Sequence, residues 1–226
     1  MAKKILVIAA HPDDEILGCG GTVARMVKEG CKAYTLILGE GATARDEQRD
    51  IEKRKEGIES LKKQAHKAGE IIGVEKTFFY DFPDNRFDSV ELLDIVKVVE
   101  KIKDEIKPTL VFTHYEKDLN IDHCITFRAV MTATRPTTHE AVKEIYSFEV
   151  LSSTEWNYPL SFSPDTFFDI TETINEKVKA MEQYTSELRE FPYPRSAQGI
   201  ELNAKTWGMK TGLRYAEAFK CVRSIY

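Results

Sequence analysis

The sequence predicts an α/β protein with a mostly parallel, doubly wound sheet flanked by helices. Short apolar segments rich in β-branched residues, the pattern of strands buried on both faces, alternate four times with longer helical segments. Polar clusters containing histidine and aspartate follow the first and the fourth of these strands, where open α/β sheets bind their ligands. We therefore expect right-handed βαβ crossovers and a site at the carboxyl edge of the sheet.

The first strand and helix are the clearest elements. Residues 4–10 form a continuous aliphatic run, which predicts a buried strand, and residues 15–28 have a buried stripe followed by Gly30, which favours a helix end. Gly18, Gly20 and Gly21 fall inside that helix, so we expect close packing on the sheet rather than a phosphate-binding loop. The same pattern predicts strands at 34–38, 77–80 and 109–113 and helices at 45–73 and 90–106.

Beyond Arg135-Pro136 the alternation is weaker. The sequence predicts strands at 144–151 and 165–170, a helix at 172–189, a loop at 191–195 and an apolar terminal segment at 215–222. Because no repeat, linker or shift in composition separates a second unit, we expect a single domain over 1–226. Its core is expected at 1–135 and a C-terminal elaboration at 136–226.

Composition excludes several classes of function. The net charge is −5, with 32 basic and 37 acidic residues evenly mixed, so there is no electrostatic case for binding nucleic acid. The apolar stretch after Lys3-Lys4 is broken at residue 11, too early for a signal peptide, and we expect no membrane span. Four widely spaced cysteines favour free thiols in a reducing compartment, which predicts a cytoplasmic protein.

The cluster His11-Pro12-Asp13-Asp14-Glu15 is the most informative motif of the chain. Three acids after a buried strand have no packing explanation and would repel one another without a cation. A catalytic zinc typically has about three His or carboxylate ligands and one open position for water. His11, Asp14 and His123 satisfy this requirement, with Pro12 stiffening the turn, so we expect Zn²⁺ or another divalent metal there.

Two further acids are candidates for roles beside the metal. Asp13 lies between two expected ligands and is our candidate general base for a metal-bound water. Asp122 precedes His123 and is expected either to accept the second ring N–H of His123 or to orient a substrate hydroxyl.

At this point the chain resembles the LmbE-like, or PIG-L, family of zinc-dependent N-deacetylases. The resemblance lies in Ala10-His11-Pro12-Asp13-Asp14-Glu15, in Asp118-x-Asn120-x-Asp122-His123 and in Tyr215-Ala216-Glu217-Ala218-Phe219. It implies a Rossmann-like fold and hydrolysis of an acetamide, usually on an N-acetylglucosamine-type sugar. It also implies metal ligation by the positions that match His11, Asp14 and His123, with Asp13 as base.

The chain departs from this family pattern at one important position. Many members have a histidine where this chain has Asn120, which donates a hydrogen bond to an oxyanion but cannot transfer a proton. Either His114 or Asp13 is therefore expected to donate the proton to the leaving amine. For the substrate we single out Arg54, in a region that also carries Arg45 and Arg49, together with Glu40 after the second strand and Asp118 in the loop after the fourth.

Two classes of function compete. The leading hypothesis is a metal-dependent hydrolase that removes an acetyl group from an N-acetylated amino sugar or its conjugate, a small-molecule substrate. The alternative is a non-catalytic sugar-nucleotide or metal-binding module that uses the acids for a structural cation. The conjugated group and the oligomeric state stay open, and the aromatic residues of the C-terminal part leave room for a homo-oligomer surface.

Overall fold

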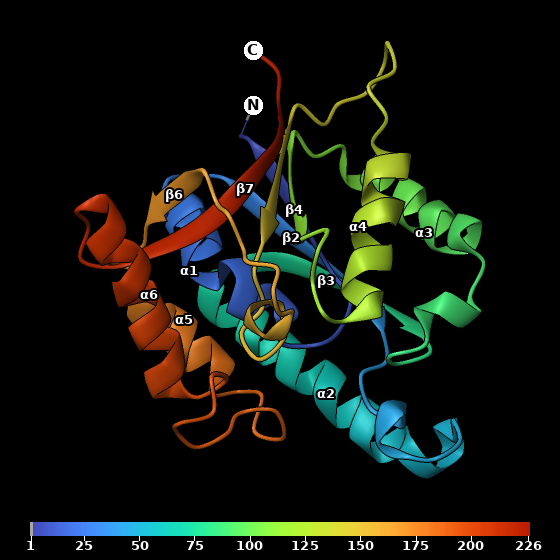
Figure 1. The fold of residues 1–226 in the computed structure, drawn as a ribbon. Helices are drawn as coiled ribbons and strands as arrows, with labels where there is room; N and C mark the ends of the chain where they lie inside the picture. Colours follow the sequence, from blue (N-terminus) through green and yellow to red (C-terminus); the bar gives the residue numbers. More distant parts are fainter. Residues whose placement is uncertain (1) are drawn as a thin grey trace.

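The computed structural model describes residues 2–226 and contains one mixed sheet in which seven strands follow the order β3-β2-β1-β4-β5-β7-β6 (Figure 1). Strands β1 to β5 pair in parallel, and β7 runs antiparallel to both β5 and β6. The predicted doubly wound, mostly parallel sheet is confirmed. The strands are β1 (Lys4–Ala9), β2 (Lys32–Gly39), β3 (Val74–Phe82), β4 (Leu110–His114), β5 (Glu144–Phe148), β6 (Thr166–Asp169) and β7 (Ala216–Ser224).

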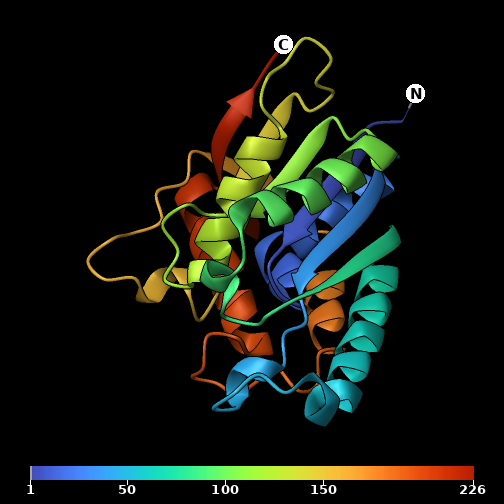
Figure 2. The same cartoon turned by 90° about the vertical axis from the view of Figure 1, so that its right-hand side faces the viewer.

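Helices cover both faces of the sheet. One apolar core lies between the sheet and α1, α2 and α5, and a second lies between the sheet and α3 and α4. Figure 2 shows α3 and α4 on one side of the strands and α2 and α5 on the other. The α-helices of the described chain are α1 (Asp14–Lys28), α2 (Ile51–Ile72), α3 (Leu92–Ile106), α4 (Ile121–Ala133), α5 (Ile174–Met181) and α6 (Ala197–Thr211).

The strand order reverses between β1 and β4, and this reversal positions the site. The chain moves outward from β1 to β2 and β3, then returns to add β4 and β5 on the other side of β1. The carboxyl ends of the parallel strands β1 and β4 therefore lie side by side, with diverging connections that leave a crevice. The segment that starts at His11 follows β1, and residues 115–120 follow β4.

Two helix boundaries differ from the sequence prediction, and one helix was not predicted. The predicted helix at 45–73 begins only at Ile51, because the Asp50 side chain accepts a hydrogen bond from Lys53 N and caps it. The predicted helix at 172–189 ends at Met181, and the following residues form a loop. Helix α6 was not predicted, because its buried positions, Ile200, Ala204 and Gly208, give only a weak apolar stripe.

Helix α1 packs directly on the sheet through its glycines, as predicted. A Cβ added at Gly18 would lie 2.2 Å from Cδ2 of Phe148 on β5. The helix departs from regular geometry at Cys19, and Glu217 of β7 accepts hydrogen bonds from the backbone N–H groups of Gly21 and Thr22 just beyond. The C-terminal motif around Glu217 therefore stabilises the helix that follows the His11 segment.

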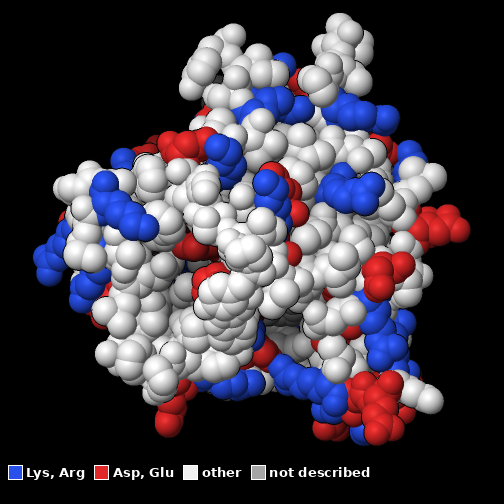
Figure 3. Space-filling model, in the orientation of Figure 1, with Lys and Arg blue, Asp and Glu red and all other residues white. Residues whose placement is uncertain are grey.

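The described residues contain no helix long and apolar enough to cross a bilayer. Figure 3 shows Lys and Arg intermixed with Asp and Glu over the visible face, including the lower edge, where acidic and basic groups adjoin.

Candidate metal centre and active site

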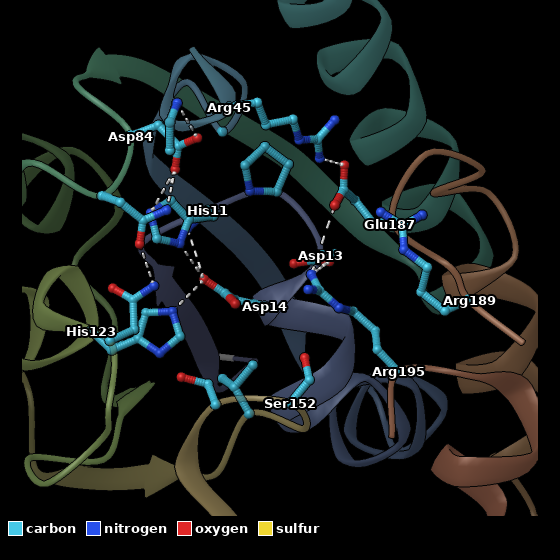
Figure 4. Close-up of a pocket in the computed structure, with 17 residues that line it drawn as sticks. His11, Asp13, Asp14, Arg45, Asp84, His123, Ser152, Glu187, Arg189 and Arg195 are labelled. Carbon is cyan, nitrogen blue, oxygen red and sulfur yellow. Dashed lines mark hydrogen bonds and ion pairs between the residues drawn. The ribbon is translucent and has the colours of Figure 1, made fainter. Parts of the chain in front are cut away.

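A cavity of about 310 Å³ opens at the carboxyl edge of the sheet (Figure 4). Its wall combines the segment after β1, the segments after β2 and β3, the start of α4, the loop after β5 and the loop between α5 and α6. The residues that line it are His11, Pro12, Asp13, Asp14, Gly41, Ala44, Arg45, Asp84, Asn85, Asn120, His123, Val150, Ser152, Ser153, Glu187, Arg189 and Arg195.

The three predicted metal ligands lie together in this cavity. Oδ2 of Asp14 lies 3.4 Å from Nδ1 of His11 and 3.4 Å from Nε2 of His123. One ligand atom from each residue lies within 4.8 Å of the others, close enough for one ion to contact all three. Three ligands that face an open cavity match a catalytic rather than a structural metal centre.

The remaining nitrogen of each histidine ring is held by a buried carboxylate. Nε2 of His11 lies 2.9 Å from Oδ2 of Asp122, and Nδ1 of His123 lies 3.1 Å from Oδ1 of Asp118. These contacts fix the ring orientation and favour the tautomers whose free nitrogens face Asp14. Asp122 therefore orients His11, which is neither of the two roles expected of it, the orientation of His123 or of a substrate hydroxyl. Its other oxygen, Oδ1, accepts a hydrogen bond from Phe87 N.

The donor set fits a divalent cation. Both ring nitrogens of His123 are buried and lack a hydrogen bond of regular geometry among the described residues: Nδ1 is in ion-pair contact with Asp118, and Nε2 faces the Asp14 carboxylate at 3.4 Å. A buried ring nitrogen left without a partner is costly, and a cation between it and Asp14 would remove that cost. His, Asp and His with one open position are the ligand types that catalytic zinc binds.

The charges of the metal-free site show how strongly these ligands interact. Burial lowers the pKa of His11, but its hydrogen bonds with Asp122 and Asp14 outweigh burial and hold that pKa well above its ordinary value. Burial acts in the same direction on His123, but Asp14 and Asp118 raise its pKa to about 9. Because these contacts raise both pKa values, proton binding by the two imidazoles competes with metal binding.

Asp13 lies beside this centre and is held by a contact that the sequence did not reveal. Its Oδ2 accepts a 2.7 Å hydrogen bond from Nη1 of Arg195, which comes from the loop between α5 and α6. The pKa of Asp13 is raised to about 7, because burial and the carboxylates of Asp14 and Glu187 together outweigh the lowering effect of Arg195. The carboxylate that we expected to act as base is thus buried, oriented and in contact with the cavity.

The backbone of Asp13 is strained, with a φ of 105°. Its N–H donates a 3.1 Å hydrogen bond to Oε2 of Glu15, and the Tyr184 hydroxyl donates to the other Glu15 oxygen. Burial raises the pKa of Glu15 to about 8. Glu15 and Tyr184 therefore support the turn between the two expected ligands from behind.

Asn120 is both a helix cap and a cavity residue. Its Oδ1 accepts a hydrogen bond from the backbone N–H of Asp122 at 2.9 Å, and its Nδ2 donates to Oδ1 of Asn85 at 2.7 Å. These contacts fix the direction of the amide and leave one Nδ2–H unassigned. Asn120 is thus placed to donate a hydrogen bond into the cavity, but not a proton.

Four sequence expectations are corrected by the positions of the side chains. His114 is fully buried behind His123, with Nε2 accepting from Ala10 N, so it cannot reach a substrate as an acid. Glu40 is buried below the cavity, where its carboxylate binds the N–H groups of Ala42 and Thr43.

The other two corrections concern Arg54 and Asp118. Arg54 pairs with Asp46 on the surface through two hydrogen bonds of 2.6 and 2.8 Å and does not line the cavity. Asp118 orients His123 and accepts hydrogen bonds from the Ser153 and Thr154 hydroxyls, so it positions a ligand rather than a substrate.

Several cavity residues were not predicted. Arg189, Arg195 and Glu187 come from the segment between α5 and α6, where the sequence predicted a helix up to residue 189 and then a proline-rich loop at 191–195. Ser152 also lines the cavity and has a φ of 69°, which is rare for a residue with a side chain. No local spacing links these residues to the metal motif, since they reach it only through tertiary packing.

Fold and site together define a Rossmann-like protein with a His–Asp–His cluster that could hold a metal ion at the carboxyl edge of its sheet. The chain belongs to the GlcNAc-PI de-N-acetylase (PIG-L) family, which it matches over residues 6–134, more than half of its length. The resemblance drawn from the three sequence motifs is confirmed.

Two curated relatives and one solved structure show the range of this similarity. The chain is 28% identical over 190 residues to the uncharacterized deacetylase YaiS of Escherichia coli (strain K12), covering 81% of this chain and 91% of the relative. It is 25% identical to the diacetylchitobiose deacetylase of Thermococcus kodakarensis, covering 99% of this chain and 85% of that one. The conserved protein TT1542 of Thermus thermophilus superimposes with a TM-score of 0.77 at 25% identity, covering 100% of this chain and 97% of that chain.

Proposed function

We propose that the protein is a zinc-dependent N-deacetylase that releases acetate from an N-acetylglucosamine-type amino sugar or its conjugate. The observation that carries the proposal is the grouping of His11, Asp14 and His123 around one open position, with the Asp13 carboxylate beside them. Membership of the PIG-L family and the named diacetylchitobiose deacetylase support the acetamido sugar as substrate. Neither of the curated relatives named above supports the alternative, a non-catalytic binding module.

The residues divide the chemistry between them. His11, Asp14 and His123 would hold a divalent ion, which would supply a water of lowered pKa and polarisation of the substrate carbonyl. Asp13 takes a proton from the attacking water, with Arg195 holding its carboxylate in place. Asn120 donates its unassigned N–H to the oxygen on which negative charge develops.

The proton must then reach the leaving amine. Asn120 cannot supply it, and His114 lies behind the metal ligands, where a substrate does not reach. Asp13 holds the proton that it took from the water and lies in the cavity wall, so we assign it the second transfer as well. One residue thus serves first as base and then as acid.

The protein loaded with zinc should release acetate from N-acetylglucosamine derivatives, and the protein freed of metal by a chelator should not. Asp13→Asn should lower kcat by about 10²- to 10⁴-fold, because general-base catalysis is lost while the metal ligands stay. Acetate release and zinc content per chain are the two measurements. Unchanged turnover in the variant would disprove the role of Asp13, and no acetate from any acetamido sugar would disprove the proposed function.

We also propose that the protein works in the cytoplasm. All four cysteines are free thiols, and such thiols persist in reducing compartments.

A further inference from the structure

Three guanidinium groups line one wall of the cavity. Arg45 comes from the segment after β2, and Arg189 and Arg195 come from the loop that joins α5 to α6. Figure 4 shows the three side chains grouped around Glu187, across the cavity from the two histidines. Only Arg195 contacts the proposed base, so the hydrolysis itself gives the other two no role.

Two of these three cations are balanced by carboxylates. Nη2 of Arg45 donates a 2.5 Å hydrogen bond to Oε1 of Glu187. Arg195 pairs with Asp13 at 2.7 Å and lies 3.8 Å from Oε2 of Glu187. The positive charges of Arg45 and Arg195 are therefore largely neutralised by carboxylates of the protein itself.

Arg189 differs from its two neighbours. Its Nη1 donates to the backbone carbonyl oxygens of Ser186 and Leu188, at 2.7 and 3.4 Å. No carboxylate in residues 2–226 forms an ion pair with it, and its Nε and Nη2 have no protein acceptor there. Arg189 is thus an exposed cation in the cavity wall with free donors and no counter-charge.

The other acids of the cavity do not supply that counter-charge. Asp14 faces the histidines, and Asp84 accepts hydrogen bonds from Ala44 N and from the Asn85 amide. A guanidinium with free, coplanar N–H groups binds a carboxylate or a phosphate more favourably than it binds a neutral group. Because Arg189 lies across the cavity from His11 and His123, the cavity favours a ligand with its acetamide near the two histidines and its negative charge near Arg189.

We propose that Arg189 forms a subsite for an anionic group carried by the substrate. The group is a carboxylate or a phosphate on the part of the molecule remote from the acetamide. This inference rests on the proposed deacetylase function and narrows its substrates to acidic conjugates of N-acetylglucosamine.

Three substrates test the subsite: the methyl glycoside, the carboxymethyl glycoside and the 1-phosphate of N-acetylglucosamine. The measured quantity is the ratio of kcat/KM for each anionic compound to that for the neutral one. A charge-assisted hydrogen bond predicts a ratio of about ten for the wild type. In Arg189→Gln the ratio should fall toward one, and a difference between the two anions would show which source of charge the subsite prefers.

Arg135→Gln is the matched control. Arg135 is also exposed, but it lies between α4 and β5, at the opposite edge of the sheet, and does not line the cavity. This variant should keep the wild-type ratio. A wild-type ratio near one, or an unchanged ratio in Arg189→Gln, would overturn the inference.

Failure of the proposed function gives a different result. If none of the three compounds releases acetate, the deacetylase assignment fails, and calorimetric binding of the same compounds still decides the subsite. Tighter binding of the anionic compounds that is lost in Arg189→Gln would support it. Equal binding of all three compounds by both proteins would overturn it.

Discussion

At the scale of single residues, the two histidines that we expect to bind a metal are oriented by carboxylates outside the expected ligand set. Asp122 fixes His11, and Asp118 fixes His123, so each ring presents a defined nitrogen to Asp14. Asp118 is itself held by the Ser153 and Thr154 hydroxyls and by the backbone N–H of Asn120. The metal affinity of the site should therefore depend on Asp118, although Asp118 is not one of the expected metal ligands.

Asp118→Asn should weaken zinc binding by about 10- to 100-fold, because the His123 ring loses its charged acceptor. Zinc affinity can be measured by competition with a chromophoric chelator. Asp94→Asn, which removes an exposed carboxylate from the first turn of α3, is the control and should bind zinc like the wild type. Equal zinc affinity in the Asp118 and Asp94 variants would argue against this role.

At the scale of elements, the contact between α1 and β5 determines how closely the metal-binding turn approaches the sheet. Gly18 leaves no room for a methyl group, since the added carbon would lie 2.2 Å from the Phe148 ring. The neighbouring residue Leu17 of α1 is held by Lys177 of α5, whose Nζ donates to the Leu17 carbonyl at 2.7 Å and to Glu217 at 2.5 Å. Three elements distant in sequence thus fix the helix that starts with Asp14.

Gly18→Ala should lower the free energy of unfolding by about 1–3 kcal/mol, because the ring or the helix must move. Urea unfolding followed by circular dichroism measures the change. Gly57→Ala in α2 is the matched substitution: no atom outside its own helix lies within 4 Å of the added carbon, and alanine is the better helix former. That variant should gain up to about 1 kcal/mol. Destabilisation of both variants by the same amount would contradict the packing argument.

At the scale of the whole molecule, the metal centre joins segments from the two halves of the chain. His11 and Asp14 follow β1, His123 lies in α4, and Arg195 reaches Asp13 from beyond β6. A cation that binds only the assembled site stabilises the folded state by mass action. Metal binding should therefore be visible in the unfolding of the complete protein.

Zinc at about 100 times its dissociation constant should stabilise the fold by about 2.7 kcal/mol. For a chain of this length that corresponds to a rise in Tm of about 5–10 °C. Scanning calorimetry with and without zinc measures the shift, and His123→Ala should abolish most of it. A zinc-dependent shift of the same size in that variant would place the ion elsewhere.

We also propose that the 226 residues act as one domain. The C-terminal segment adds β7 and β6 to the same sheet, and the Lys177–Glu217 pair links it to α1. Calorimetry should therefore show a single transition with equal calorimetric and van't Hoff enthalpies. Two separable transitions would indicate that the segment after residue 135 unfolds independently.

The strands of the sheet could be predicted from the sequence, whereas one helix and one helix end could not. The alternation of buried strands and amphipathic helices predicted the sheet, because both patterns depend on local spacing. Helix α6 was not predicted, because its buried residues are few and mostly small and give only a weak apolar periodicity. The end of α5 at Met181 was also not predicted, because the sequence of the residues that follow is compatible with a helix and only tertiary packing ends the helix there.

For the site, the sequence alone determined the metal-binding residue types and their place after β1 and near β4, because strand ends and motif spacing are local properties. Only the tertiary structure decided which carboxylate orients which histidine, since Asp118 and Asp122 are near neighbours of His123 and their partners depend on the facing of α4. It also decided that His114 and Arg54 stay outside the cavity and that Arg189 and Arg195 enter it. Those positions are set by packing between segments far apart in the chain, which no local pattern of residues records.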